Sequence, residues 1–267
     1  MFHALPKPFL YSAYRLFAEF DKSGEKKTAQ GTAFFVTDGK SRIGLVTNRH
    51  AIDLAYKDSK YVGFQLSGLA IRGYFEKGSF AHAAINLSNA KLVMAATYSE
   101  DVATVRLGQI QVHDSSVVGT FTPYAVRWEM LATKVDFDGA LDICDMVAFP
   151  GYPPWFDRDG QRPIIRCGTI ASDPISNYSW KDGQPVGRRL AYEAFSFGGS
   201  SGSPVFALEK GIKLGPGLQG GYHRDAKLIG INAGHLSDKD DFPSHHSGIS
   251  YLFKSTVILD CLEGLFV

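Results

Sequence analysis

The sequence lacks several features that mark specialised classes of protein. Its 267 residues include only 3 cysteines, at 144, 167 and 261, and an odd number at wide spacing is unlike the paired cysteines of small secreted domains. The formal net charge is +1, so the chain has no basic excess with which to displace counterions from nucleic-acid phosphates. We therefore expect reduced cysteines and no nucleic-acid partner.

Targeting signals are also missing from the sequence. Residues 1–20 do not show a basic segment followed by a continuous apolar segment and a small-residue cleavage site. No other apolar run is long enough to span a bilayer. We expect a chain that is neither secreted nor inserted in a membrane, and hence a cytoplasmic location.

Short apolar segments separated by turns are what the sequence does have, with 28 glycines and 12 prolines. Residues 14–20 and 102–107 alternate polar and apolar side chains, which is the period of a strand with one buried face. Residues 31–36 and 228–233 are almost wholly apolar and are followed by turn residues, as core strands are. The pattern predicts an all-β sandwich or barrel without internal repeats.

Helical periodicity is clear only near the C-terminal end of the sequence. There Ser255 is placed to cap a helix. Its apolar face would consist of Val257, Ile258, Cys261, Leu262 and Leu265. No low-complexity linker divides the chain, so we expect one unit over 1–267, with a soft boundary near 117–123 between the halves 1–118 and 119–267. The junction of two packed halves is a common place for a substrate cleft.

A glycine-rich serine motif, FGGSSGSPVF at 197–206, carries the first chemical signal. Acyl transfer needs a projecting hydroxyl beside N–H groups that converge on the developing oxyanion, and glycine permits the backbone shape this requires. Ser201 is the candidate nucleophile, and the N–H groups of Gly199 and Ser201 are the candidate oxyanion donors. Taken alone such a run is usually a surface turn, but here it lies between two apolar segments.

The same motif also fits the G-x-S-x-G elbow of α/β-hydrolases, with Ser200 as nucleophile. That elbow requires a helix directly after the serine. Pro204 and the strand-like residues that follow it disfavour a helix there, and the chain lacks alternating strand and helix units. Ser200 therefore remains the lesser alternative.

A histidine and an aspartate precede the serine in the chain order that one type of triad requires. His50 follows an apolar strand, and Asp101 opens an alternating strand. A general base must accept the serine proton at one imidazole nitrogen while a carboxylate holds the other. We therefore expect His50, Asp101 and Ser201 to converge, with Glu100 as the fallback carboxylate. Taken alone, such a histidine is more often a structural or surface residue, and such an aspartate more often lies in a solvated loop.

Together the three segments resemble the chymotrypsin-type serine proteases, and most closely the compact trypsin-like peptidase domains of bacteria. LVTNRHAI (45–52) is similar to their T-A-x-H segment, EDVATVRL (100–107) to their D-[IV]-A segment, and GSSGSP (199–204) to G-x-S-G-x-P. The likeness continues through 147–153, 168–170 and 228–231. It implies two packed six-stranded antiparallel β-barrels with the triad between them, followed by the short helix.

Two departures from the family pattern are informative. Asn48 stands where a small residue is usual, two places before the histidine. Secreted digestive members carry, before the serine, an aspartate that pairs with a newly cut N-terminus; that place here is Ser200, and no activation site is present. We therefore expect no zymogen activation by insertion of an N-terminus.

The resemblance also implies a specificity pocket without a carboxylate at its base. Its lining would be Phe195, Ala233, Gly234, His235 and Gly248. An apolar floor cannot pair a lysine or arginine, so cleavage after small or apolar residues is expected. An imidazole from His235, His245 or His246 could instead favour an acidic or amide side chain. These histidines lack the ligand spacing of a zinc site, so neither a metal nor another cofactor is expected.

Three functions follow from these residues. The first is an endopeptidase that forms an acyl-enzyme on Ser201, with protein or peptide substrates. The second is a protease fold that is silent or gated by a regulatory protein partner and serves for binding, because a fold alone does not prove chemistry. The third is an esterase that uses Ser200.

Overall fold

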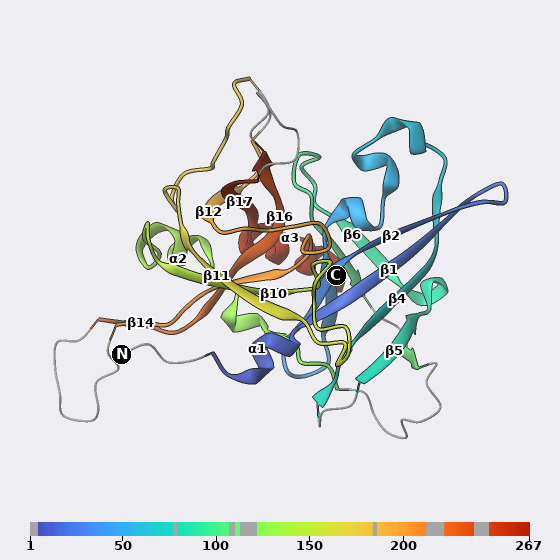
Figure 1. Ribbon diagram of the computed structural model, residues 1–267, viewed down its shortest axis with the longest axis horizontal. Helices are drawn as coiled ribbons and strands as arrows, with labels where there is room; N and C mark the ends of the chain where they lie inside the picture. Colours follow the sequence, from blue (N-terminus) through green and yellow to red (C-terminus); the bar gives the residue numbers. More distant parts are fainter. Residues whose placement is uncertain are drawn as a thin grey trace.

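The computed structural model describes residues 5–76, 80–106, 110–112, 122–183, 186–211, 222–237 and 246–267. Strands predominate and form two neighbouring groups, as Figure 1 shows, with the barrel on its left and the sheet on its right. The first group comes from the N-terminal half of the sequence and the second from the C-terminal half.

The first group is a sheet whose strands pair in the order β6-β7-β3-β2-β1-β4-β5-β8, with β9 added beside β2. Their bounds are β1 Ala13–Lys22, β2 Glu25–Thr37, β3 Ile43–Thr47, β4 Gln65–Tyr74, β5 Phe80–Ile85, β6 Lys91–Met94, β7 Ala103–Arg106, β8 Ile110–Val112 and β9 Val126–Arg127. The long β1–β2 hairpin projects from the molecule (Figure 1). Its tip, Ser23–Gly24, has positive φ at both residues, which suits the twist of a two-residue hairpin turn.

The second group is a closed barrel in which the strands pair in the order β10-β11-β12-β17-β16-β13. Their bounds are β10 Met146–Gly151, β11 Ile164–Ile170, β12 Arg189–Glu193, β13 Pro204–Ala207, β16 Lys227–Ser237 and β17 His246–Lys254. A short ribbon of β14 Lys210–Gly211 and β15 His223–Arg224 lies outside it. The barrel interior is filled by large side chains such as Phe149, Tyr192 and Leu252, all buried.

The predicted all-β class and the strands at 14–20, 31–36 and 228–233 are confirmed. Of the alternating segment at 102–107, residues 103–106 form β7, and residue 107 lies outside the described part. Of the two predicted six-stranded barrels, the C-terminal one is confirmed. The N-terminal barrel is not confirmed, since β6 and β8, at the two ends of the described sheet, do not pair. The division at residue 118 stays a prediction, and residues 117–121 of the proposed boundary lie outside the described part.

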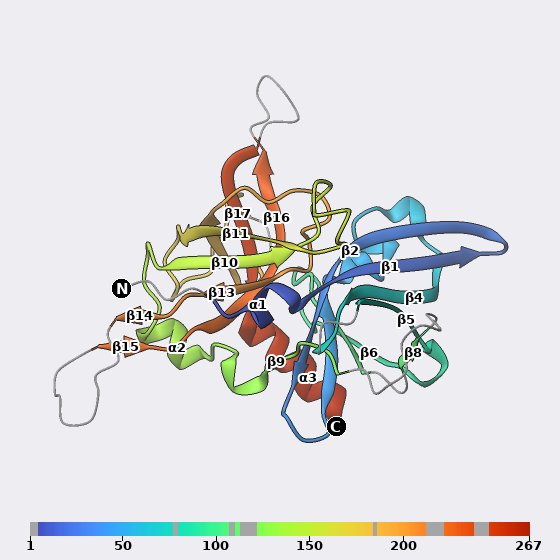
Figure 2. The ribbon, with the colours of Figure 1, turned by 60° about the horizontal axis from the view of Figure 1, so that its bottom comes forward.

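The C-terminal helix α3, Ser255–Phe266, joins the two groups of strands. The five apolar residues that the sequence assigns to its buried face are all buried. They share one core cluster with Val46 of β3 and Phe206 of β13, and Figure 2 shows the helix, in red, running between sheet and barrel. The prediction that Ser255 caps the helix is wrong. Lys254 precedes the first turn, and the Ser255 hydroxyl instead donates to the Ala132 carbonyl.

Two short helices were not anticipated from the sequence. Helix α1, Lys7–Tyr11, begins beside Pro6 and leads into β1. Helix α2, Lys134–Gly139, starts with a capping box in which Thr133 and Asp136 satisfy each other's backbone groups. Single turns of 3-10 helix occur at Arg49–Ala51 (η1), Leu54–Tyr56 (η2), Ser59–Tyr61 (η3), Leu87–Asn89 (η5) and Trp128–Met130 (η6).

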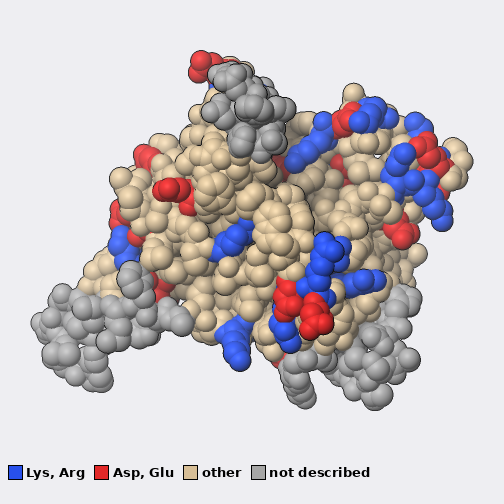
Figure 3. Space-filling view, in the orientation of Figure 1, with Lys and Arg blue, Asp and Glu red and all other residues tan. Residues whose placement is uncertain are grey.

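Surface charge is mixed on the face shown in Figure 3. Lysine and arginine side chains lie beside aspartate and glutamate side chains in the same areas, so this face has no broad region of one sign. All three cysteines are free thiols. No helix in the described part of the chain is long and apolar enough to cross a membrane.

Candidate active site

His50 and Asp101 are brought together by two neighbouring strands. Strand β3 runs antiparallel to β7, with Thr47 opposite Ala103. The chain just after β3 therefore lies beside the chain just before β7. His50 follows β3 in the short helix η1, and Asp101 lies two residues before the start of β7. The antiparallel register thus places the predicted base and the predicted carboxylate side by side.

Asp101 holds both the side chain and the backbone of His50. Its Oδ2 lies 2.6 Å from His50 Nδ1, and its Oδ1 accepts the His50 backbone N–H at 2.9 Å. The Asp101 side chain is only 6% exposed. Burial alone would raise the pKa of this carboxyl, but the bonds from His50 and the nearby charge of Lys57, 3.7 Å away, keep its pKa below the ordinary value. Asp101 is therefore a carboxylate at neutral pH.

Asn48, the unusual residue before the histidine, supports the same contact. Its side chain is fully buried and donates from Nδ2 to the Asp101 carbonyl at 2.7 Å. A small residue could not make this bond. The departure from the family pattern therefore ties the segment before His50 to the segment that carries Asp101.

The loop that carries Ser201 is bound to strand β2. Thr32 donates its backbone N–H to the Ser201 carbonyl at 2.8 Å and its hydroxyl to the Gly199 carbonyl at 2.7 Å. A Cβ added at Gly31 would lie 3.3 Å from the Ser201 carbonyl oxygen and 3.8 Å from the Ala51 side chain. One strand therefore contacts both the serine loop and the residue after His50, although the Ser201 hydroxyl forms no hydrogen bond with the His50 imidazole.

The backbone N–H groups of the serine loop divide into bonded and unbonded ones. The Ser200 N–H donates to the Phe197 carbonyl and the Gly202 N–H to the Asn232 carbonyl, each at 2.9 Å. The N–H groups of Gly199 and Ser201 have no acceptor in the described part of the chain. Gly199 has φ of 85°, and a Cβ there would lie 2.4 Å from the Tyr152 carbonyl oxygen, so only glycine fits. Both predicted oxyanion donors are thus among the unbonded N–H groups of this loop.

The alternative residues are engaged elsewhere. Glu100, the fallback carboxylate, is buried and binds the Arg188 guanidinium through both oxygens, at 2.8 and 2.9 Å. Ser200, the alternative nucleophile, is fully buried, and its hydroxyl accepts a hydrogen bond from Arg166. Strand β13, not a helix, follows the motif. The geometry of an α/β-hydrolase elbow is therefore absent at this described segment.

The residues expected to line the specificity pocket do not all lie together. Rings of Phe195, His235 and His246 are in contact, with centroid distances of 5.0 Å between Phe195 and His246 and 4.3 Å between the two histidines. Gly248 donates its N–H to His246 Nδ1 at 2.8 Å. Ala233 is instead buried in the core cluster shared with α3.

The other residues of the predicted pocket differ in their surroundings and in their exposure to solvent. A Cβ at Gly234 would meet the Tyr251 ring at 3.3 Å or less. Phe195 is 57% exposed, so its ring is open to solvent. His246, which the sequence offered only as an alternative imidazole for this pocket, lies against Phe195. His245 lies outside the described residues.

Both described histidines of this cluster are held neutral at neutral pH. Burial lowers the pKa of His235, and burial together with the charges of His235 and Arg166 lowers the pKa of His246 to about 4. A neutral imidazole can share a hydrogen bond but cannot form an ion pair. Near neutral pH the cluster is therefore an uncharged aromatic surface.

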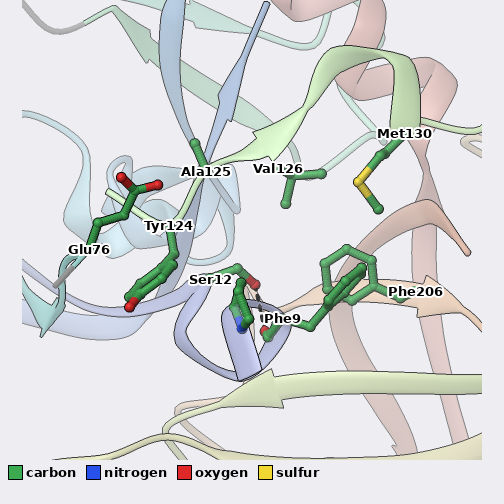
Figure 4. A pocket seen from close by; sticks show the side chains of 9 residues that line it. Phe9, Ser12, Glu76, Tyr124, Ala125, Val126, Met130 and Phe206 are labelled. Atoms are coloured by element: carbon green, nitrogen blue, oxygen red, sulfur yellow. Dashed lines mark hydrogen bonds between the residues drawn. The ribbon is translucent and has the colours of Figure 1, made fainter. Parts of the chain in front are cut away.

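One other cavity is well formed but lies away from these residues. It has a volume of about 420 Å³ between α1, β9 and β13. Figure 4 shows Phe9 and Phe206 on one side of it and Val126 and Met130 on another, with Glu76 as its charged lining residue. None of the predicted catalytic residues lines it, so it is separate from the candidate active site.

A histidine and two carboxylates lie close together at the β14–β15 ribbon. His223 Nε2 is 3.0 Å from an Asp225 oxygen and 3.6 Å from a Glu209 oxygen. This is the one group of three potential metal ligands within the described residues, and two of its members are exposed. A hydrogen bond between the imidazole and the Asp225 carboxylate accounts for the shorter distance. His235 and His246 do not belong to this group, and His245 lies outside the described residues.

Comparison with known proteins identifies the architecture. No protein-family model matches the sequence, and no curated protein matches it. The structure is similar to the crystal structure of Deg5, a trypsin-like protease of the HtrA type, with a TM-score of 0.51 and 13% identity, over 95% of this chain and 88% of that one. The fold is chymotrypsin-like. At this identity the likeness establishes the chymotrypsin-like fold alone, and the chemistry has to be argued from the site.

Proposed function

We propose that the chain is a serine endopeptidase in which Ser201 is the nucleophile, His50 the general base and Asp101 the carboxylate that orients it. The contact between His50 Nδ1 and the buried Asp101 carries this proposal. A carboxylate in that place fixes the imidazole tautomer and stabilises the imidazolium that forms when the base accepts a proton. The chymotrypsin-like fold supports the assignment.

The reaction would proceed in two halves on these groups. His50 Nε2 accepts the proton of the Ser201 hydroxyl while Oγ attacks the scissile carbonyl, and the Gly199 and Ser201 N–H groups bind the resulting oxyanion. His50 then returns the proton to the leaving amine, which leaves an acyl-enzyme. Water, deprotonated by His50, attacks the ester, and the carboxylic acid product departs as Ser201 regains its proton.

A partner-gated binding module is the second candidate, because the Ser201 hydroxyl and the His50 imidazole share no hydrogen bond here. Catalytic hydrogen bonds are often long without substrate and tighten in the complex, so the observation is also compatible with an active enzyme. Reactivity of Ser201 decides between the two functions.

A fluorophosphonate probe tests the nucleophile directly. We expect the wild-type chain to be labelled on Ser201, the Ser201→Ala variant to be unlabelled, and the Ser200→Ala variant to keep its label because the Ser200 hydroxyl is buried. Mass spectrometry of the labelled peptide identifies the modified residue. An unreactive but folded wild-type chain would favour the binding module, and label lost only in Ser200→Ala would favour the esterase.

Cleavage after small or apolar residues is the specificity we propose. The uncharged cluster of Phe195, His235 and His246 supports this preference, since it offers no charge to pair with a lysine, arginine, aspartate or glutamate side chain. Profiling a peptide library should show turnover after alanine, valine or leucine at least about tenfold above turnover after charged residues, as an unpaired buried charge implies. Preferred cleavage after glutamate or aspartate at pH 7 would contradict the proposed pocket.

A further inference from the structure

Arg166 is a partly buried arginine on β11 that contacts the serine loop. It pairs in the barrel with Phe149 of β10. Its guanidinium carbon lies 5.0 Å from the centre of the Phe149 ring and 5.3 Å from the centre of the Phe197 ring. Contacts of this kind between a cation and aromatic faces are favourable and fix the plane of the guanidinium.

The guanidinium binds the serine loop at two separated points. Nη1 donates to the Phe195 carbonyl at 2.6 Å, and Nη2 donates to the Ser200 hydroxyl. Phe197 and Gly199 lie between these two points in sequence, and Ser201 follows the second. A planar guanidinium with divergent donors thus spans the segment whose N–H groups we assign to the oxyanion.

Arg166 has no ionic partner that would explain its position. No carboxylate lies within ion-pair distance of it among the described residues, whereas Arg188, just before β12, has two. Its Nε is buried without a hydrogen-bond partner. Burial lowers its pKa, but an arginine side chain remains protonated in proteins. Burying a cation without an ionic partner, even in part, is unfavourable for folding, so we take the contacts with the serine loop as the reason for the position of Arg166.

We propose that Arg166 is a positioning residue that holds the 195–201 segment in the conformation in which the Gly199 and Ser201 N–H groups are free to bind an oxyanion. This inference rests on the proposed function. It also gives the serine at position 200 a role: the position at which digestive relatives carry an aspartate for a newly cut N-terminus here accepts a bond from an internal cation. The loop is therefore organised without cleavage of the chain.

Steady-state kinetics of two variants test the proposal. Arg166→Met keeps the length and packing of the side chain but removes its donors. We expect kcat to fall about 10²-fold, comparable to the loss of one oxyanion donor, with KM changed less than about threefold. Affinity for a peptide aldehyde, whose hemiacetal oxygen uses the same donors, should fall in parallel with kcat. Arg166→Lys should recover only part of both, because an ammonium cannot span the two acceptors.

Two further measurements distinguish positioning from general support of the fold. Guanidinium ion added to Arg166→Ala should restore part of kcat, whereas sodium at the same ionic strength should not. Amide hydrogen exchange should be faster in the 195–202 segment of Arg166→Met. This second readout does not depend on turnover, so it remains informative if the wild-type chain fails to cleave peptides and the proposed function falls.

Arg72→Met is the matched control. Arg72 also lies over an aromatic ring, 4.9 Å from the centre of Phe17, and also has a buried Nε without a partner, but it belongs to β4 of the sheet. We expect it to keep kcat, aldehyde affinity and exchange of the 195–202 segment at wild-type levels. Unchanged kcat and unchanged exchange in Arg166→Met would overturn the proposal, as would equal effects of both variants.

Discussion

Replacing Ser201 with alanine is expected to lower kcat roughly 10⁵- to 10⁶-fold, because residues of a triad act as a unit and the nucleophile has no substitute. His50 and Asp101 would remain in contact, and the free N–H groups could still bind a carbonyl oxygen, so KM should change little. Turnover of a chromogenic peptide, measured against the uncatalysed rate, gives the loss. Thermal unfolding should be nearly unchanged, since the Ser201 hydroxyl makes no hydrogen bond with His50.

Ser203→Ala provides the comparison within the same motif. Ser203 is fully buried, and its hydroxyl has no hydrogen-bond partner. The Ser203→Ala variant should keep kcat within about threefold of wild type, because an unpartnered hydroxyl can be removed at little cost in stability. If Ser201→Ala and Ser203→Ala had the same activity, Ser201 could not be the nucleophile.

Asp101→Asn should lower kcat/KM about 10³- to 10⁴-fold near pH 7, an effect of the size known for this kind of substitution in serine proteases. Oδ1 accepts the His50 backbone N–H, so the amide oxygen of an asparagine would stay on that side. Its NH₂ group would then face Nδ1 and force the imidazole proton onto Nε2, the nitrogen that must accept the proton of Ser201. The measurement is a pH profile of kcat/KM with a peptide substrate.

The same substitution should alter stability in acid. The pKa of Asp101 lies below its ordinary value in the folded chain, so its contribution is present above the unfolded pKa and is lost as pH falls through the folded pKa. Urea unfolding between pH 3 and 7 should therefore depend less on pH in Asp101→Asn. Asp138→Asn, which loses only an exposed pair with Lys134, should match wild type in both measurements.

Local pattern was enough to predict much of this molecule. Alternation along β1 and β7, the apolar run in β16 and the buried face of α3 follow from periodicities of two and 3.6 residues, which the sequence displays directly. The approach of His50 to Asp101 was predictable because each residue sits at the end of a recognisable strand. The order of residues in the chain then selected a single type of triad.

Features that depend on tertiary contacts could not be read in the same way. Arg166 lies in a segment with no motif, and its importance comes from Phe195 and Ser200, which are distant in sequence. The proximity of Lys57 to Asp101 and of His246 to Phe195 likewise depends on how loops and strands cross. Helices α1 and α2 are too short for a helical period to be visible.

The position of α3 has a consequence for the stage of synthesis at which the strands beside His50 and Asp101 are fully packed. This helix is encoded last among the described elements, yet it packs against β3, β6 and β7 of the N-terminal sheet. His50 and Asp101 adjoin β3 and β7, so the strands that present them keep an uncovered apolar surface until residues 255–266 have left the ribosome. A nascent chain that already contains all three proposed catalytic residues would still lack this support, so the proposed hydrolysis would require synthesis to have passed the helix.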